Sequence, residues 1–90
     1  MSPRIRLSTL LRQAAGWQEV LVIKAETPVE CLQYLEKNFP DMRRWLYDSR
    51  GNMWDRLQIY LNGQAIHGGE LTKRLNDEDE LFILLNIGGG

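Results

Sequence analysis

The sequence predicts an α+β fold, in which a mixed sheet carries one main helix packed on one of its faces. Three observations lead to this prediction. Segments 4–8 and 57–61 alternate apolar side chains with polar or charged ones, which is the pattern of a strand with one buried face, and the apolar segment 81–86 is expected to be the final strand. A well-capped helix begins at Thr27. The dipeptide Asn62-Gly63 then follows an alternating segment, as in a hairpin turn.

The first two strands are expected to pair with each other. In residues 4–8 the apolar side chains are Ile5 and Leu7, which should point into the core. A short loop or helical turn should follow, up to Gly16. Residues 19–25 carry apolar side chains on both faces, so we expect a second strand that returns along the first as its hairpin partner.

The main helix has the clearest local signal in the chain. The Thr27 side chain can accept a hydrogen bond from a free backbone N–H, Pro28 occupies the first helical position, and Glu30 completes a capping box. The helix should end at Asn38 or Phe39, because the next residue is a proline. Its apolar stripe is expected at Val29, Leu32, Leu35 and Phe39.

Segment 41–56 has a less regular pattern. The turn-forming residues 48–52 predict a short helical turn or a small hairpin folded about Gly51. Bulky side chains in this segment can cover one end of the core, which is the first use of aromatic bulk. The alternative is a recognition lobe, because aromatic side chains are enriched at interfaces. The bulky residues are Met42, Trp45, Leu46, Tyr47, Met53 and Trp54.

The remaining elements follow from turn signals. Asn62 and Gly63 both tolerate the positive φ of a type I′ turn, so residues 57–61 should form a hairpin with residues 64–66. The elements expected after this hairpin are one helical turn between Leu71 and Leu75, an acidic turn at 76–80 and a final strand at 81–86.

Composition argues against several classes of function. Eleven basic and twelve acidic side chains give a net charge of −1, which does not suit binding to nucleic acid through phosphate neutralisation. No apolar run approaches the roughly 20 residues that span a bilayer. The residues after Met1 lack the apolar stretch of a signal peptide, so we expect a cytoplasmic protein that does not enter membranes.

No pattern of residues indicates an enzyme or a metal site. Cys31 is the single cysteine, and on a helix we expect it to be a small apolar filler rather than a reactive thiol. His67 has no orienting partner at a motif spacing, so a surface polar role is expected. The chain has no Cys/His cluster with zinc spacing, no nucleophile elbow and no phosphate-binding loop.

The chain finishes in Gly88, Gly89 and Gly90, which suggest a flexible tail on a domain formed by residues 1–87. Without Cβ atoms, such a tail can enter a narrow channel. Three to four extended residues reach roughly 10–13 Å, far enough to place the terminal carboxylate in another protein's active site. A frayed end or a linker stub has the same composition, so the tail alone leaves both interpretations open.

Taken together, the order of elements is a β-grasp arrangement. With the Leu61-Asn62-Gly63 hairpin, the acidic turn before Leu81 and the Gly89-Gly90 end, the whole chain resembles the ubiquitin-like sulfur carriers of the MoaD/ThiS family. The stretch from Leu46 to Gly63 is similar to the CysO-type branch and to small archaeal modifiers.

 This resemblance implies a carrier protein that has no enzyme activity of its own and binds no cofactor. On its own, the protein is expected to be a monomer. The resemblance implies that its terminal carboxylate, on Gly90, is adenylated by an ATP- and Mg-dependent enzyme of the ubiquitin-activating type and is then converted to a thiocarboxylate with a persulfide or sulfide donor. It also implies that the thiocarboxylate hands its sulfur to an acceptor synthase, while Gly88 and Gly89 enter the partner's channel. The acceptor pathway stays open among cysteine, methionine, cofactor and thio-metabolite synthesis.

Docking on such enzymes requires a surface near the tail. If Leu81, Ile83 and Leu85 face the core, then Phe82 and Leu84 project from the opposite face. Beside Ile87, they would form an apolar patch at the base of the tail, and such patches are typical of partner sites. The family likewise binds its partners through an apolar face near the tail. The residues expected to bind partners are therefore Phe82, Leu84 and Ile87.

Two positions depart from the molybdopterin-synthase subunit of that family. Ser8 stands where that subunit tends to have an aromatic residue, and Asn86 replaces its proline before the tail. Both differences argue against that particular pathway. Two alternatives to a sulfur carrier remain: a ubiquitin-like modifier joined through Gly90 to lysines of target proteins, and an interaction module whose glycines are a linker.

Overall fold

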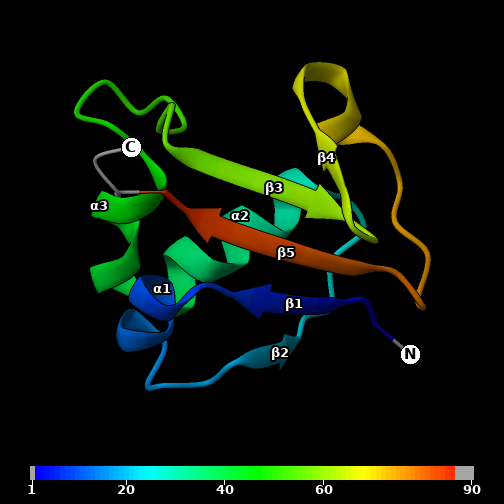
Figure 1. Cartoon of the computed structure of the whole chain (residues 1–90), viewed down its shortest axis with the longest axis horizontal. Helices are drawn as coiled ribbons and strands as arrows, with labels where there is room; N and C mark the ends of the chain where they lie inside the picture. The colour runs from blue at the N-terminus through cyan, green and yellow to red at the C-terminus, as the bar shows by residue number, and fades with distance from the viewer. Residues whose placement is uncertain (1, 87–90) are drawn as a thin grey trace.

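The computed structural model describes residues 2–86, which form one five-stranded mixed sheet with helix α2 across one face (Figure 1). The strand order is β2-β1-β5-β3-β4; β1 and β5 run parallel, and the other neighbours are antiparallel. This is the expected α+β, β-grasp arrangement. The strands are β1 Arg4–Leu7, β2 Val20–Val22, β3 Leu57–Leu61, β4 Gln64–Ile66 and β5 Glu80–Leu85.

Three α-helices and two 3-10 turns complete the described chain. The main helix is α2, and the shorter helices α1 and α3 lie at the end of the sheet where β5 finishes (Figure 1). No helix within residues 2–86 is long and apolar enough to cross a membrane. The helical elements are α1 Thr9–Ala14, α2 Pro28–Asn38, η1 Pro40–Met42, α3 Arg43–Leu46 and η2 Gly68–Thr72.

The core lies between the sheet and α2. Ile5 of β1 is paired with Leu21 on one side and with Leu81 on the other, and all three side chains are buried. Ile59 and Ile83 continue this layer across β3 and β5. The alternation that the sequence predicts for the first, third and final strands is therefore confirmed.

Strand β2 is shorter than expected, because it covers Val20–Val22 rather than residues 19–25. After it the backbone turns, with the Ala25 N–H donating to the Ile23 carbonyl at 3.0 Å, and leads to α2. Leu21 of β2 and the following Ile23 are buried in the core, whereas the alternate residues Val20 and Val22 are exposed on the opposite face of the sheet.

Helix α2 begins and ends where its capping signals predict. The Thr27 hydroxyl accepts a hydrogen bond from the Glu30 N–H at 3.1 Å, and the helix ends at Asn38. The Glu30 carboxylate accepts from the Glu26 N–H at 3.2 Å, so the reciprocal bond of the capping box is displaced by one residue. Leu32 and Leu35 of the expected stripe are buried, but Val29 is only half-buried, and Phe39 is half-buried at the cap after the last helical residue. The buried residues of α2 are Pro28, Cys31, Leu32 and Leu35.

Segment 40–56 combines both conformations that were expected of it. Helices η1 and α3 come first, and a small antiparallel bridge then joins Tyr47 to Met53 around Gly51, whose φ is 85°. Met42 and Leu46 are fully buried. The segment therefore covers one end of the core.

The hairpin between β3 and β4 has the expected turn, with φ values of 50° at Asn62 and 87° at Gly63. The Asn62 side chain also ties this turn to the start of β5. Its amide donates to the Asp79 carboxylate at 2.9 Å, and its oxygen accepts from the Glu80 N–H at 3.0 Å. The beginning of the final strand is thus held by a residue 18 positions earlier.

Candidate functional site

The candidate site is built on β5, the central strand of the sheet. Its side chains alternate strictly, so that Leu81, Ile83 and Leu85 are buried against α2 while Phe82 and Leu84 are half-buried on the opposite, open face. The placement expected of Phe82 and Leu84 is therefore confirmed, although their role in binding stays a prediction. Ile87, Gly88, Gly89 and Gly90 lie outside the described residues.

Strand β3 adds an aromatic side chain to the open face. Tyr60 is paired with Phe82, and their ring centroids are 6.2 Å apart. The Tyr60 hydroxyl donates to the Gln58 side-chain oxygen at 2.8 Å, and Gln58 is paired with Leu84. We call Tyr60, Phe82 and Leu84 the β5 patch. The sequence analysis missed Tyr60, although the alternation in residues 57–61 places it on the open face.

Charged side chains surround the β5 patch in a shallow hollow of about 550 Å³. Arg6 lies 3.7 Å from the Glu80 carboxylate, and Arg12 lies 3.5 Å from that of Glu19. All four charged side chains are exposed or half-exposed, and such pairs contribute only about 0–1 kcal/mol. These groups can therefore exchange their present partners for charged groups of another protein at little cost. The open face therefore has an apolar centre surrounded by positively and negatively charged side chains.

The end of β5 is fixed on both sides by hydrogen bonds. On one side, the buried Ser8 hydroxyl accepts from the Leu85 N–H at 3.2 Å. On the other, the Arg56 carbonyl accepts from the Asn86 N–H at 2.9 Å. A proline in place of Asn86 has no N–H and cannot make this bond. The two departures from the molybdopterin-synthase subunit, Ser8 and Asn86, thus both hold the backbone where the tail begins.

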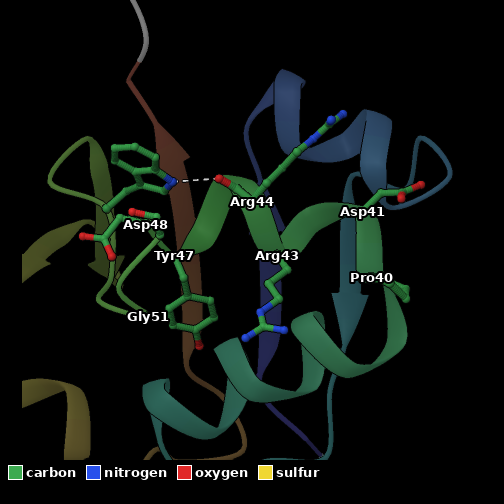
Figure 2. A pocket seen from close by; sticks show the side chains of 9 residues that line it. Pro40, Asp41, Arg43, Arg44, Tyr47, Asp48 and Gly51 are labelled. Atoms are coloured by element: carbon green, nitrogen blue, oxygen red, sulfur yellow. Dashed lines mark hydrogen bonds between the residues drawn. The ribbon is translucent and has the colours of Figure 1, made fainter.

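A second hollow, of about 600 Å³, is lined by residues of η1, α3 and turn 48–51, together with Tyr47 and Trp54 (Figure 2). In Figure 2 the side chains of Arg43 and Tyr47 point toward α2, and Arg43 makes an ion pair with Glu36 at 3.1 Å. Asp48 accepts hydrogen bonds from the backbone N–H groups of Arg50 and Asn52 at 2.8 and 3.0 Å. Arg43 and Asp48, two charged residues that line this second hollow, are therefore already engaged in contacts within the domain.

Two ionisable groups have raised pKa values, and neither suits catalysis near neutral pH. Burial, assisted by the Glu30 carboxylate, raises the pKa of Cys31 to about 12, so this thiol stays protonated in the core. Partial burial raises the pKa of Tyr47, Glu36 raises it further, and Arg43 opposes the change. Among residues 2–86, no group of three or more His, Cys, Asp or Glu side chains could hold a metal ion.

The structure is similar to several solved structures of small proteins. It superposes on small archaeal modifier protein 1 from Methanosarcina acetivorans with a TM-score of 0.82 and 27% identity, over 98% of this chain and 95% of that one. For CysO from Mycobacterium tuberculosis, the TM-score is 0.79 at 25% identity, over 96% of this chain and 100% of that one. The CysO complex with BexX from Amycolatopsis orientalis gives 0.82 at 22% identity, over 99% and 100%.

These likenesses extend over essentially the whole chain. They confirm the resemblance to the MoaD/ThiS family in its CysO-type form. Comparison of the sequence with models of protein families and with curated proteins gives no match.

Proposed function

Because the chain has the β-grasp fold of the ubiquitin-like sulfur carriers that it resembles, we propose that it is itself a sulfur carrier, with the carboxylate of Gly90 as its working group. One observation carries this proposal. Strand β5 is bonded to neighbours on both sides up to Leu85 and Asn86, and the sequence then continues as Ile87 and three glycines. A rigid strand that leads into a thin terminal segment suits the delivery of that terminus into an enzyme.

The chemistry requires an activating enzyme. A terminal carboxylate has a pKa of roughly 3.3–3.7, so near neutral pH it is an anion and a poor electrophile. Attack of this carboxylate on the α-phosphorus of ATP releases pyrophosphate and leaves AMP as a good leaving group on the acyl carbon. Sulfide then attacks that carbon, AMP departs, and a thiocarboxylate remains. A persulfide donor gives the same product once a thiol has reduced the resulting disulfide.

Binding through the body of the carrier makes the terminal reaction effectively intramolecular. The β5 patch supplies an apolar surface next to the root of the tail, and the exposed ion pairs around it can be replaced by contacts with the partner. Docking there raises the local concentration of the terminus in the enzyme's site. We assign Phe82 and Leu84 to this contact, with Ile87 continuing it along the chain.

Mass spectrometry tests the proposal. The protein is incubated with its cognate activating enzyme, ATP, Mg²⁺ and sulfide, and its intact mass should show one terminal oxygen replaced by sulfur. A variant that lacks Gly90 should show no such change while it still binds the enzyme. An unmodified wild-type terminus under conditions in which the enzyme consumes ATP would contradict the proposal.

Conjugation to other proteins is the second candidate function, and the similarity to a small archaeal modifier protein favours it. The activation of Gly90 is the same, but the acceptor is a lysine amine rather than sulfide. Digestion of proteins from the native host should then yield peptides in which Gly90 is joined to a lysine side chain. Recovery of the thiocarboxylate without such peptides would support the carrier alone.

A further inference from the structure

Two arginines at the root of the tail, Arg44 and Arg56, make no ion pair within residues 2–86, although both side chains are exposed. The chain as a whole has a net charge of −1. Arg44 and Arg56 thus place two positive charges without an ion-pair partner next to each other at the end of β5, whereas Arg50 and Lys24, which also make no ion pair in the described chain, do not line that site. The arginines that do form ion pairs are Arg4, Arg6, Arg12, Arg43 and Arg74.

The side chains of both arginines line one small hollow of about 100 Å³ at the end of β5. Its apolar lining comes from Trp45, Trp54 and the buried Leu85. Arg56 is also the residue whose carbonyl holds the N–H of Asn86. We call Arg44, Trp45, Trp54 and Arg56 the collar. Because Leu84 and Leu85 point to opposite sides of the sheet, the collar and the β5 patch flank the strand end from different sides.

The collar is held in place by contacts of its own. The Arg44 guanidinium carbon lies 5.1 Å from the centroid of the Trp45 ring, which is the geometry of a cation–π contact. The Trp54 indole N–H donates to the Arg44 carbonyl at 2.7 Å, as the dashed line in Figure 2 shows. The Trp54 backbone N–H donates to the Leu46 carbonyl at 3.1 Å. A surface that is ordered in advance loses less entropy on binding.

We propose that the collar binds an acidic segment of the adenylating enzyme, at the entrance of the channel that receives the tail. This inference rests on the proposed function. Guanidinium groups bind carboxylates through paired, charge-assisted hydrogen bonds, and the two arginines have no such partner within the described chain. The apolar lining between them fits a short apolar side chain next to the acidic residue. The enzyme then holds the strand end from both sides.

Charge reversal tests this assignment. The double variant Arg44→Glu/Arg56→Glu is compared with Arg50→Glu/Lys24→Glu, which makes the same change of charge at exposed residues that line neither the collar nor the β5 patch. Affinity for the adenylating enzyme is measured by calorimetry at low and high salt. We expect the collar variant to lose about tenfold or more in affinity at low salt and to lose most of the salt dependence, while the control stays near wild type.

Further measurements separate the possible outcomes. Equal affinities of the two double variants overturn the collar assignment, even where the wild-type terminus is converted normally to the thiocarboxylate. If the collar variant binds the enzyme more weakly but the wild-type protein never acquires a thiocarboxylate, the result counts against the proposed function and not against the collar. If the collar variant binds the enzyme as tightly as wild type but self-associates differently in ultracentrifugation, the collar contacts a second copy of this protein. That result also overturns the proposal. If the charge-reversed protein unfolds, Arg44→Gln/Arg56→Gln provides the same comparison.

Discussion

The Ser8 hydroxyl accepts a hydrogen bond from the backbone N–H of Leu85 at 3.2 Å, and so joins two residues that lie 77 positions apart. Ser8 follows β1, and Leu85 ends β5, which runs parallel to β1. The Ser8 N–H also donates to the Ile83 carbonyl at 3.0 Å. One small buried residue therefore continues the parallel pairing beyond the last residue of β1 and positions the root of the tail.

Replacement of Ser8 by alanine should destabilise the protein by about 1–3 kcal/mol, because the buried Leu85 N–H loses its partner. The free energy of unfolding, measured by urea denaturation, checks this. Ser49→Ala is the control, since Ser49 is exposed in a turn and should change the stability by less than about 0.5 kcal/mol. Equal effects of both variants would show that the Ser8 bond contributes nothing.

Leu84→Asp should leave the fold intact and abolish binding to the activating enzyme, because it places a charge within the apolar β5 patch. The matched control is Val22→Asp, which places the same charge on the open face at the far edge of the sheet, where Val22 is 67% exposed. Calorimetric titration measures the affinity, and circular dichroism verifies the fold. Unaltered binding of Leu84→Asp would remove this patch from the docking surface.

Asn62→Ala should cost about 1–3 kcal/mol, since it removes two side-chain hydrogen bonds to the start of β5 and puts a less suitable residue at a φ of 50°. Gln64→Ala, at an exposed position of the same hairpin, serves as the comparison. Thermal and urea unfolding of the two variants measure the difference. A loss no larger than that of Gln64→Ala would mean that the Asn62 contacts with Asp79 and Glu80 are not stabilising.

The stability of the protein should fall as the pH rises from about 9 to about 12, because the pKa of Cys31 increases from 9.0 to about 12 on folding. The protonated thiol is favoured in the folded state, so its contribution is complete below pH 9 and is lost as the pH passes through the folded value. The loss is on the order of a few kcal/mol. Cys31→Ala should have a shallower alkaline decline in urea denaturation, and an identical decline would contradict this explanation.

The fold could be predicted where a local sequence pattern also determines how an element packs. The side chains of β1, β3 and β5 indicated which face of each strand is buried. The Thr27 cap indicated where α2 begins, and Asn62-Gly63 indicated the turn between β3 and β4. The length of β2 could not be predicted, because Val20, Val22 and Lys24 fit a strand equally well on an edge. The strand ends at Val22 because this residue pairs with Arg4, where β1 begins. A local sequence pattern does not reveal this pairing.

Parts of the site also depend on contacts that no local pattern reveals. Phe82 and Leu84 follow directly from the period of β5, but their neighbour Tyr60 depends on the register between β3 and β5. Arg56 lies beside the end of β5 because its backbone carbonyl accepts a hydrogen bond from the Asn86 N–H, a contact between residues that are far apart in the sequence. Segment 41–56 thus proved to cover the core through Met42 and Leu46 while its exposed side chains surround the end of β5.

The central position of β5 also links tail presentation to the integrity of the whole domain. Its two neighbours are far apart in the sequence, since β1 (Arg4–Leu7) pairs on one side and β3 (Leu57–Leu61) on the other. A strand with this position opens only when most of the sheet opens, so its amide protons should exchange as slowly as global unfolding allows. A partly folded chain cannot fix Leu85 and Asn86, so the segment that follows them has no defined starting point. If the chain acts as the carrier proposed above, this topology restricts activation to fully folded molecules.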